Sequence, residues 1–174
     1  TDVFLSNAVV LRADSQLKVT HNDGPTNYLC GPISQLGGTY GITKVGAGHL
    51  VLSGTNTFGG PVNVNAGKLI LWGALAAGTD VTVSNGATFG GYGTGVDALN
   101  AHNGAAIDQT STQPSNGTLT VASLTASNGA TFKLWADGRT SLVVTAVNGF
   151  TRFAGATNRV QITIPGTPAI GTYP

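Results

Sequence analysis

The sequence is poor in charge and lacks two residue types that commonly build helices. Only 9% of its 174 residues are charged, Glu and Met are absent, and all seven acidic residues are Asp. Helix interiors draw on Glu, Lys, Ala, Leu and Met, whereas this chain is filled with Gly, Thr, Val, Asn and Ser, which favour strands and turns. We therefore expect very few helices and an all-β fold.

The sequence also lacks charge clusters, long apolar runs and paired cysteines. Its net charge is +1, and the basic residues are scattered from Arg12 to Arg159. No cluster could follow a phosphate backbone, which argues against a nucleic-acid partner. No run of eighteen apolar residues could span a membrane as a helix, and the amino terminus lacks a basic and apolar signal sequence. Cys30 is alone, which excludes an internal disulfide and a cysteine-based metal site.

What the chain does contain is an internal repeat. Residues 48–67 align without a gap on residues 67–86, at an offset of nineteen positions. A further copy at 129–149 needs one extra residue, and the hexapeptide SNGATF occurs at 84–89 and again at 127–132. A period near twenty residues is typical of stacked structural units.

Each copy contains runs of four or five residues with period-two alternation, such as LVLS, TFGG and PVNV, bounded by Gly, Asn and Pro. Antiparallel sheets could be built from such runs, but three runs per turn at a fixed offset favour a parallel coil. We predict a right-handed parallel β-helix (β-solenoid) of roughly seven rungs, with three short strands per rung of about 19–20 residues.

The predicted core is a set of columns. Four side chains should point inward and stack on their equivalents at a spacing of about 4.8 Å: Leu50 on Leu69, Leu52 on Leu71, Val62 on Val81 and Val64 on Val83. Asn-Gly pairs, such as those at 85–86 and 128–129, should form corners that need positive φ angles.

The sequence divides one β-helix segment, 1–174, into four parts. Residues 1–40 should form degenerate early rungs, and 41–97 the regular repeats. Residues 98–115 are polar and lack alternation, so we expect a loop insertion there; 116–174 should form later rungs and a truncated end. An uncapped last rung would present unpaired backbone groups and would need a neighbour.

The stretch ITKVGAGHLVLSGTNTFGGPVNVNAGKLIL, residues 42–71, resembles the autotransporter-associated β-strand repeat. That repeat opens with Lys-x-Gly-x-Gly-x-Leu-x-Leu-Ser-Gly-x-Asn-Thr and continues through a Gly-Gly turn, a Val-rich strand and a Gly-x-Leu strand. The signature positions matched are Lys44, Gly46, Gly48, Leu50, Leu52, Ser53, Gly54, Asn56, Thr57, Gly59, Gly60, Val62, Gly67 and Leu69. His49 and Pro61 depart from it, since Thr is usual at both positions. Residues 85–95 and 115–138 also look like later rungs of such proteins.

The resemblance implies a passenger domain of type V secretion, located outside the cell or on the bacterial surface. Its partners would be a host surface protein, a glycan or further copies of itself. Any membrane association would belong to a barrel domain outside this chain. The repeat occurs in passengers of many activities, so it identifies an architecture and does not identify a function.

Candidate catalytic groups do not form a recognisable pattern. Paired-carboxylate catalysis needs two carboxyl groups roughly 5–9.5 Å apart, and the aspartates are dispersed along the chain: Asp2, Asp14, Asp23, Asp80, Asp97, Asp108 and Asp137. None of His21, His49 and His102 lies in a triad signature. In GGYGTGVD, residues 90–97, Asp97 comes two positions too late for a calcium-binding turn. We expect no catalytic residue, no metal and no cofactor.

Contact residues are better candidates. If Leu69 and Leu71 point inward, Ile70 and Trp72 point outward, and Trp135 does so beside Phe132 and Leu134. The expected loop adds His102, Asn103 and Asp108. Exposed apolar groups and loops on a rigid scaffold favour binding, although each tryptophan could instead fold over a corner. The leading hypothesis is an adhesion or display scaffold; the alternatives are a carbohydrate-active enzyme and an end-to-end self-assembling structural protein.

Overall fold

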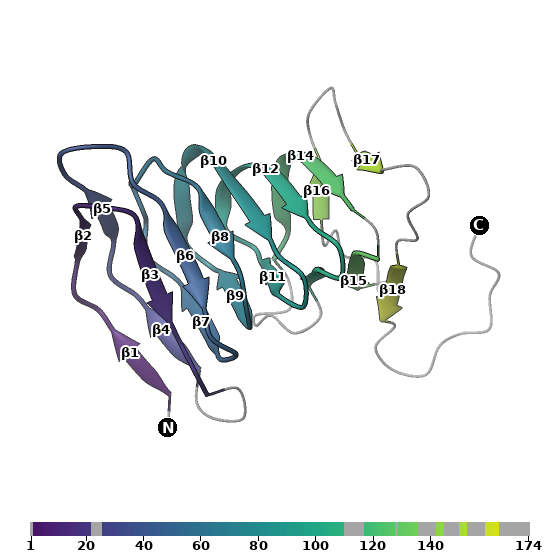
Figure 1. The fold of residues 1–174 in the computed structure, drawn as a ribbon, viewed down its shortest axis with the longest axis horizontal. Coiled ribbons are helices and arrows are strands. Elements are labelled where there is room, and N and C mark those ends of the chain that lie inside the picture. Colours follow the sequence, from purple (N-terminus) through teal and green to yellow (C-terminus); the bar gives the residue numbers. More distant parts are fainter. Residues whose placement is uncertain are drawn as a thin grey trace.

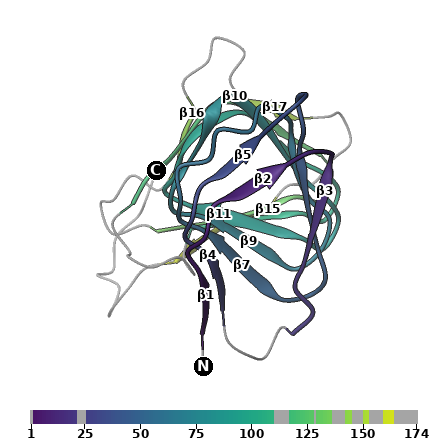
Figure 2. The ribbon, with the colours of Figure 1, turned by 90° about the vertical axis from the view of Figure 1, so that its left-hand side faces the viewer.

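The computed structural model describes residues 2–21, 26–109, 117–127, 129–135, 142–144, 150–152 and 159–163. These residues form eighteen strands, and every pairing between them is parallel. The strands stack side by side along the long axis of the molecule (Figure 1), and in the view along that axis the turns follow one another around a common centre (Figure 2).

The strands belong to three sheets. Sheet A contains β1 (Val3–Leu5), β4 (Asn27–Leu29), β7 (His49–Leu52), β9 (Lys68–Leu71), β11 (Thr88–Gly91), β13 (Ala106–Asp108), β15 (Thr131–Trp135) and β18 (Arg159–Thr163). Sheet C contains β3 (Ser15–Lys18), β6 (Ile42–Val45), β8 (Val62–Val64), β10 (Ala74–Val83), β12 (Thr94–Ala101), β14 (Leu119–Ala126) and β16 (Leu142–Val144), with β17 (Phe150–Arg152) also paired to β14. Sheet B contains β2 (Val9–Leu11) and β5 (Ile33–Gln35).

The all-β class and the parallel β-solenoid are confirmed, with about six turns. The predicted columns are confirmed as well. Leu50 pairs with Leu69 and Leu52 with Leu71 in sheet A, and Val62 pairs with Val81 and Val64 with Val83 in sheet C. All eight side chains are buried in one core cluster. The offset of nineteen residues is therefore one turn of the coil.

The third strand of each turn differs from the prediction. Among the described residues, the first two turns have it as β2 and β5, and a later turn again has three short strands, β15, β16 and β17, of which β16 and β17 both pair with β14. Between them, the run TFGG at 57–60 forms no strand. The Gly59-Gly60-Pro61 sequence bends the chain there, although the Thr57 N–H still donates to the carbonyl of Ile33 at 2.8 Å and Phe58 is fully buried. In later turns β10 and β12 pass around this corner as single long strands, with register shifts between Ala74 and Val81.

The structure also differs from the loop expected at 98–115. Residues 94–101 are β12 and 106–108 are β13, so most of this segment continues the regular coil. A turn joins the two strands, closed by a hydrogen bond from the Ala105 N–H to the His102 carbonyl at 3.0 Å. Residues 110–115, the remainder of the expected loop, lie outside the described residues.

Candidate binding site on the outer face of sheet A

One row of outward-facing residues on sheet A is unexpectedly buried. Strand register places Tyr28, Val51, Ile70 and Gly90 beside one another on β4, β7, β9 and β11. They alternate with the inward columns, so they face away from the core. Even so, Val51 is only 1% exposed and Ile70 only 6% exposed, and neither belongs to the core cluster. This face is a second packed surface.

Four aromatic side chains, which we call the aromatic ladder, account for part of that burial. The rings of Phe4 and Tyr28 stack with centroids 4.5 Å apart, those of Tyr28 and Trp72 are 5.6 Å apart, and those of Trp72 and Tyr92 are 6.1 Å apart. Tyr28 lies on β4 and Trp72 directly follows β9, and these are the two strands that flank β7. Such pairs add roughly 0.5–1.5 kcal/mol each beyond the area they bury.

A groove lies beside the ladder. It encloses about 220 Å³ and is lined by Thr26, Tyr28, His49, Val51, Lys68, Ile70 and Trp72; we call it the outer groove. Val51 and Ile70 form its apolar floor. Register places His49 beside Lys68, two positions before the floor residues on their strands, whereas Trp72 follows Ile70 by two positions. The groove therefore has a polar wall and an aromatic wall.

The polar wall carries a neutral imidazole. Burial, together with the nearby positive charges of Lys68 and Lys44, lowers the pKa of His49 from its ordinary value of 6.5. At neutral pH the side chain is therefore uncharged, with one ring nitrogen that donates a hydrogen bond and one that accepts.

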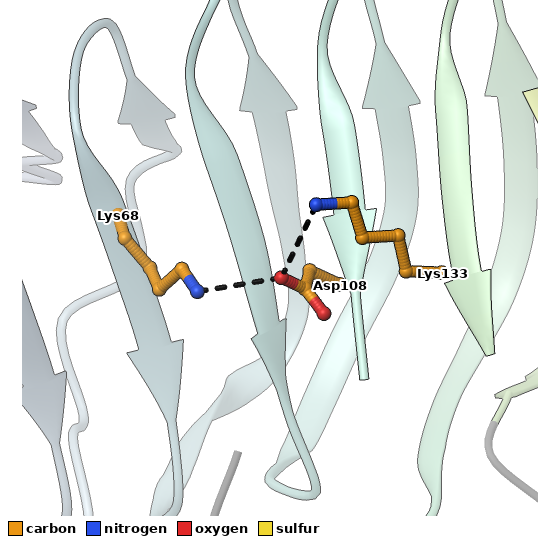
Figure 3. A network of polar contacts seen from close by, with 3 residues as sticks. All are labelled: Lys68, Asp108 and Lys133. Carbon is orange, nitrogen blue, oxygen red and sulfur yellow. Dashed lines mark hydrogen bonds and ion pairs between the residues drawn. The ribbon is translucent and has the colours of Figure 1, made fainter. Parts of the chain in front are cut away.

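A small ionic network borders the groove (Figure 3). Lys68 Nζ lies 3.4 Å from Asp108 Oδ2, and Lys133 Nζ lies 4.0 Å from the same oxygen. Lys68 extends toward β13 across β11, where Gly90 has no side chain to obstruct it. The Asp108 side chain is only 6% exposed. Pairing with lysines offsets the cost of burying its charge.

The structure brings some of the sequence-predicted contact residues together. Ile70 and Trp72 line the outer groove, and Asp108 lies in the adjoining ionic network. His102 and Asn103 are exposed in the turn between β12 and β13 and do not line the groove. Trp135 ends β15, paired with Thr163, and its side chain lies outside the described part of the structure.

Sequence reasoning missed the rest of the site. Tyr28 lies in the irregular early turns, where the offset of nineteen gives no guidance. Tyr92 carried a usable signal, since it follows Trp72 by twenty residues, close to one period of the repeat. His49 departs from the repeat signature and lies in no triad pattern, and the structure places it in the polar wall.

Signature residues of the repeat have structural contacts. Lys44 is fully buried, and its ammonium group donates to the carbonyls of Val45, Gly46 and Ala66 at 3.0, 2.7 and 3.1 Å. Burial lowers its pKa from 10.5 to about 8. Lys44 therefore ties the corner of its own turn to the corner of the next.

Asn56 makes a comparable connection on another side of the coil. Its Oδ1 accepts the Ile33 N–H at 3.0 Å, and its Nδ2 donates to the carbonyls of Gly54 and Ala74 at 3.0 and 2.9 Å. One buried amide thus joins three successive turns. This explains why the repeat requires Asn at a position that is inaccessible to any ligand.

Aspartates in the described residues have similar roles. Asp2, Asp14 and Asp80 each accept a backbone N–H from the following turn, donated by Thr26, Gly41 and Ala98 respectively. Within the described ranges no group of three or more His, Cys or Asp side chains is placed to bind a metal ion. In the part of the chain that the structure describes, no helix is long and apolar enough to cross a membrane.

Together these observations define a class: a parallel β-solenoid with a mixed aromatic and polar groove on one side face. Residues 42–71 match the passenger-associated-transport-repeat family. The segment is thus similar to this repeat family, and the match supports the predicted resemblance to autotransporter passenger repeats. Such repeats imply secretion or surface exposure in general. The comparisons find no matching curated protein and no matching solved structure.

Proposed function

We propose that the chain is an extracellular or cell-surface passenger segment that acts as an adhesion and display scaffold. The observation that supports this proposal is the outer groove. Its lining residues project from β4, β7 and β9, or from positions directly beside these strands, and the strands are joined by regular parallel ladders. Contact groups on such a framework are held in fixed positions, which reduces the entropy lost on binding.

The contacts made by polar side chains of the repeat signature and by aspartates also favour a scaffold. Lys44, Asn56 and three of the aspartates are engaged in joining turns. Three of the carboxylates that a carbohydrate-active enzyme on this coil could use for proton transfer are thereby engaged in joining turns. The groove, in contrast, offers binding surface without requiring any of them.

Adhesion can be measured with the purified chain coupled to fluorescent beads. We expect the beads to attach to cultured epithelial cells, and we expect Trp72→Ala to reduce attachment at least fivefold. Leu36→Ala is the matched control, because Leu36 is an apolar side chain that is 54% exposed and lies outside the groove. Attachment no greater than that of uncoated beads would refute the proposal.

One observation favours a second candidate, end-to-end assembly. The first turn supplies the edge strands β1, β2 and β3 of the three sheets, and the exposed large apolar residues of the described structure are Val3, Phe4, Leu5, Val10 and Leu36, all within the first two turns. Unpaired strand edges with apolar side chains favour pairing with another chain. Light scattering would detect this as a mass that rises with concentration, whereas a constant monomer mass would exclude it.

A further inference from the structure

The outer groove combines two surfaces that few ligands can satisfy at once. Tyr28 and Trp72 provide an aromatic wall above an apolar floor, and Thr26 and His49 provide hydrogen-bonding groups on the opposite side. A purely apolar side chain would offer no hydrogen bonds to the Thr26 hydroxyl and the His49 imidazole that line the groove, and burying polar groups without such bonds is costly. A purely polar ligand would gain nothing from the aromatic wall. The geometry therefore favours a group with one apolar side and one side rich in hydroxyls.

The charges around the groove further restrict the class of ligand that it can bind. Lys68, the one lysine that lines it, lies within 3.4 Å of Asp108, so its charge is opposed by a neighbouring carboxylate. His49 is uncharged at neutral pH because burial and the lysines lower its pKa. Asp2, beside Thr26, adds a second negative charge near the other end. These groups favour an uncharged ligand over a strongly acidic one.

The volume of the groove limits the size of the ligand. The groove encloses about 220 Å³, which is below the roughly 300–1,000 Å³ of sites that enclose whole drug-sized ligands. It can take one ring-sized unit, with the remainder of a larger molecule outside.

From these features we propose that the outer groove binds a terminal, neutral sugar residue of a glycan. The C–H face of the sugar ring packs against Tyr28 and Trp72, and its hydroxyls exchange hydrogen bonds with Thr26 and His49. This assignment rests on the proposed adhesive function, since it names the class of ligand for the same surface.

The test uses the full chain and four neutral probes: the methyl glycosides of glucose, galactose, mannose and N-acetylglucosamine. Binding is followed by saturation-transfer NMR and by tryptophan fluorescence, with methyl glucuronide as the acidic counterpart. We expect saturable millimolar binding of at least one neutral glycoside, weakened at least tenfold in Trp72→Ala and Tyr28→Ala and three- to fivefold in His49→Ala. Trp72→Phe should retain most of the affinity because it keeps a ring, and Leu36→Ala should be unchanged.

Circular dichroism of each variant separates loss of binding from loss of fold. If Trp72→Ala is misfolded, the comparison of Trp72→Phe with His49→Ala still tests both walls. Absence of saturable binding to all four probes would overturn the assignment, as would a preference for methyl glucuronide or binding that is unaffected by any groove variant. If bead adhesion remains sensitive to Trp72→Ala while no glycoside binds, the ligand is a protein surface and the adhesive function stands. If glycosides bind but beads do not attach, the adhesive function fails and the sugar site stands.

Discussion

At the scale of single residues, polar side chains of the repeat signature supply hydrogen-bond partners for backbone groups of the thin coil. Each turn has corners where backbone carbonyls and N–H groups lie close to the core, out of reach of water. Lys44 and Asn56 supply partners for these groups on two sides of the coil. Sequence alone identified both positions by resemblance, but their contacts reach into neighbouring turns, and no local pattern could have assigned them.

Asn56→Ala should destabilise the fold by about 1–3 kcal/mol, the cost of leaving one buried donor without a partner. The donor is the N–H of Ile33. The two carbonyls that Asn56 contacts keep other donors, because Ala74 N–H bonds to Gly54 and Asn56 N–H bonds to Ala74. Urea denaturation would measure the change. Asn63→Ala, on the outward side of β8, is the matched control and should stay within about 0.5 kcal/mol.

Lys44 should make stability depend on pH in the alkaline range. Its pKa is about 8 in the folded protein and 10.5 as the ordinary value. Between those values the unfolded chain binds more protons than the folded one, so stability increases as pH rises from about 8 to 10.5, by up to roughly 3 kcal/mol.

Denaturation midpoints measured from pH 7 to pH 10.5 would show this slope, and Lys44→Met should remove it. A midpoint that falls with pH in the wild type, or an unchanged slope in Lys44→Met, would contradict the assignment of the low pKa to Lys44.

At the scale of elements, one type of tight turn between strands was recognised from the sequence at two places and missed at a third. The SNGATF hexapeptide forms the same turn twice, with the Ala87 N–H bonded to the Ser84 carbonyl and the Ala130 N–H bonded to the Ser127 carbonyl. The segment HNGAAI at 102–107 forms that turn a third time, with Gly104 at a φ of +68°. His102, Ala106 and Ile107 replace the Ser, Thr and Phe of the hexapeptide, which hid the match. The Asn-Gly-Ala core of the turn was the signal that remained.

The outward burial on β7 and β9 could not be predicted from period-two alternation. Alternation assigns Ile70 and Val51 to the face opposite the core, and it says nothing of whether other side chains then cover that face. Coverage here depends on aromatic residues from β4 and from the positions after β9 and β11, which are separated by up to 64 residues in sequence, Tyr28 to Tyr92. Burial also raises the pKa of Tyr92.

Strand β9 should therefore be sensitive to truncation on both faces. Leu69→Ala should cost about 2–5 kcal/mol through lost burial and a cavity in the core. Ile70→Ala should cost roughly 1.5–3 kcal/mol, because its side chain is almost as buried although it faces outward. Val10→Ala on β2, whose side chain is 51% exposed, serves as the control. Denaturation of the three variants would check this, and an Ile70→Ala effect as small as the control's would show that the outer packing contributes no stability.

At the scale of the whole molecule, the described coil is close to one-dimensional. Each strand of sheet A pairs only with the preceding and following turns, in the order β1-β4-β7-β9-β11-β13-β15-β18. In such proteins stability is approximately a sum over neighbouring units. We therefore expect deletion of a whole turn to preserve the fold, and deletion of a fraction of a turn to disrupt it.

Deletion of residues 67–85 removes one period and places Gly86 where Gly67 was. We expect parallel β structure in circular dichroism, cooperative unfolding, and a urea m-value lower by about a tenth because less surface is exposed on unfolding. Deletion of residues 67–76 is the control: it removes about half a turn, puts inward side chains on the wrong side and should abolish cooperative unfolding. Equal behaviour of the two deletions would contradict a register fixed by the period of nineteen.

The direction of the ladder hydrogen bonds has a mechanical consequence. In Figure 1 the strands lie across the long axis, so the bonds between turns lie along it. A force applied to the two ends of the coil would load those bonds a few at a time, and the molecule would yield by peeling. Each released turn of nineteen residues, such as Val62 to Val81, would lengthen the chain by roughly 6 nm. A surface tether built this way would extend in regular steps at low force, with its remaining turns still folded.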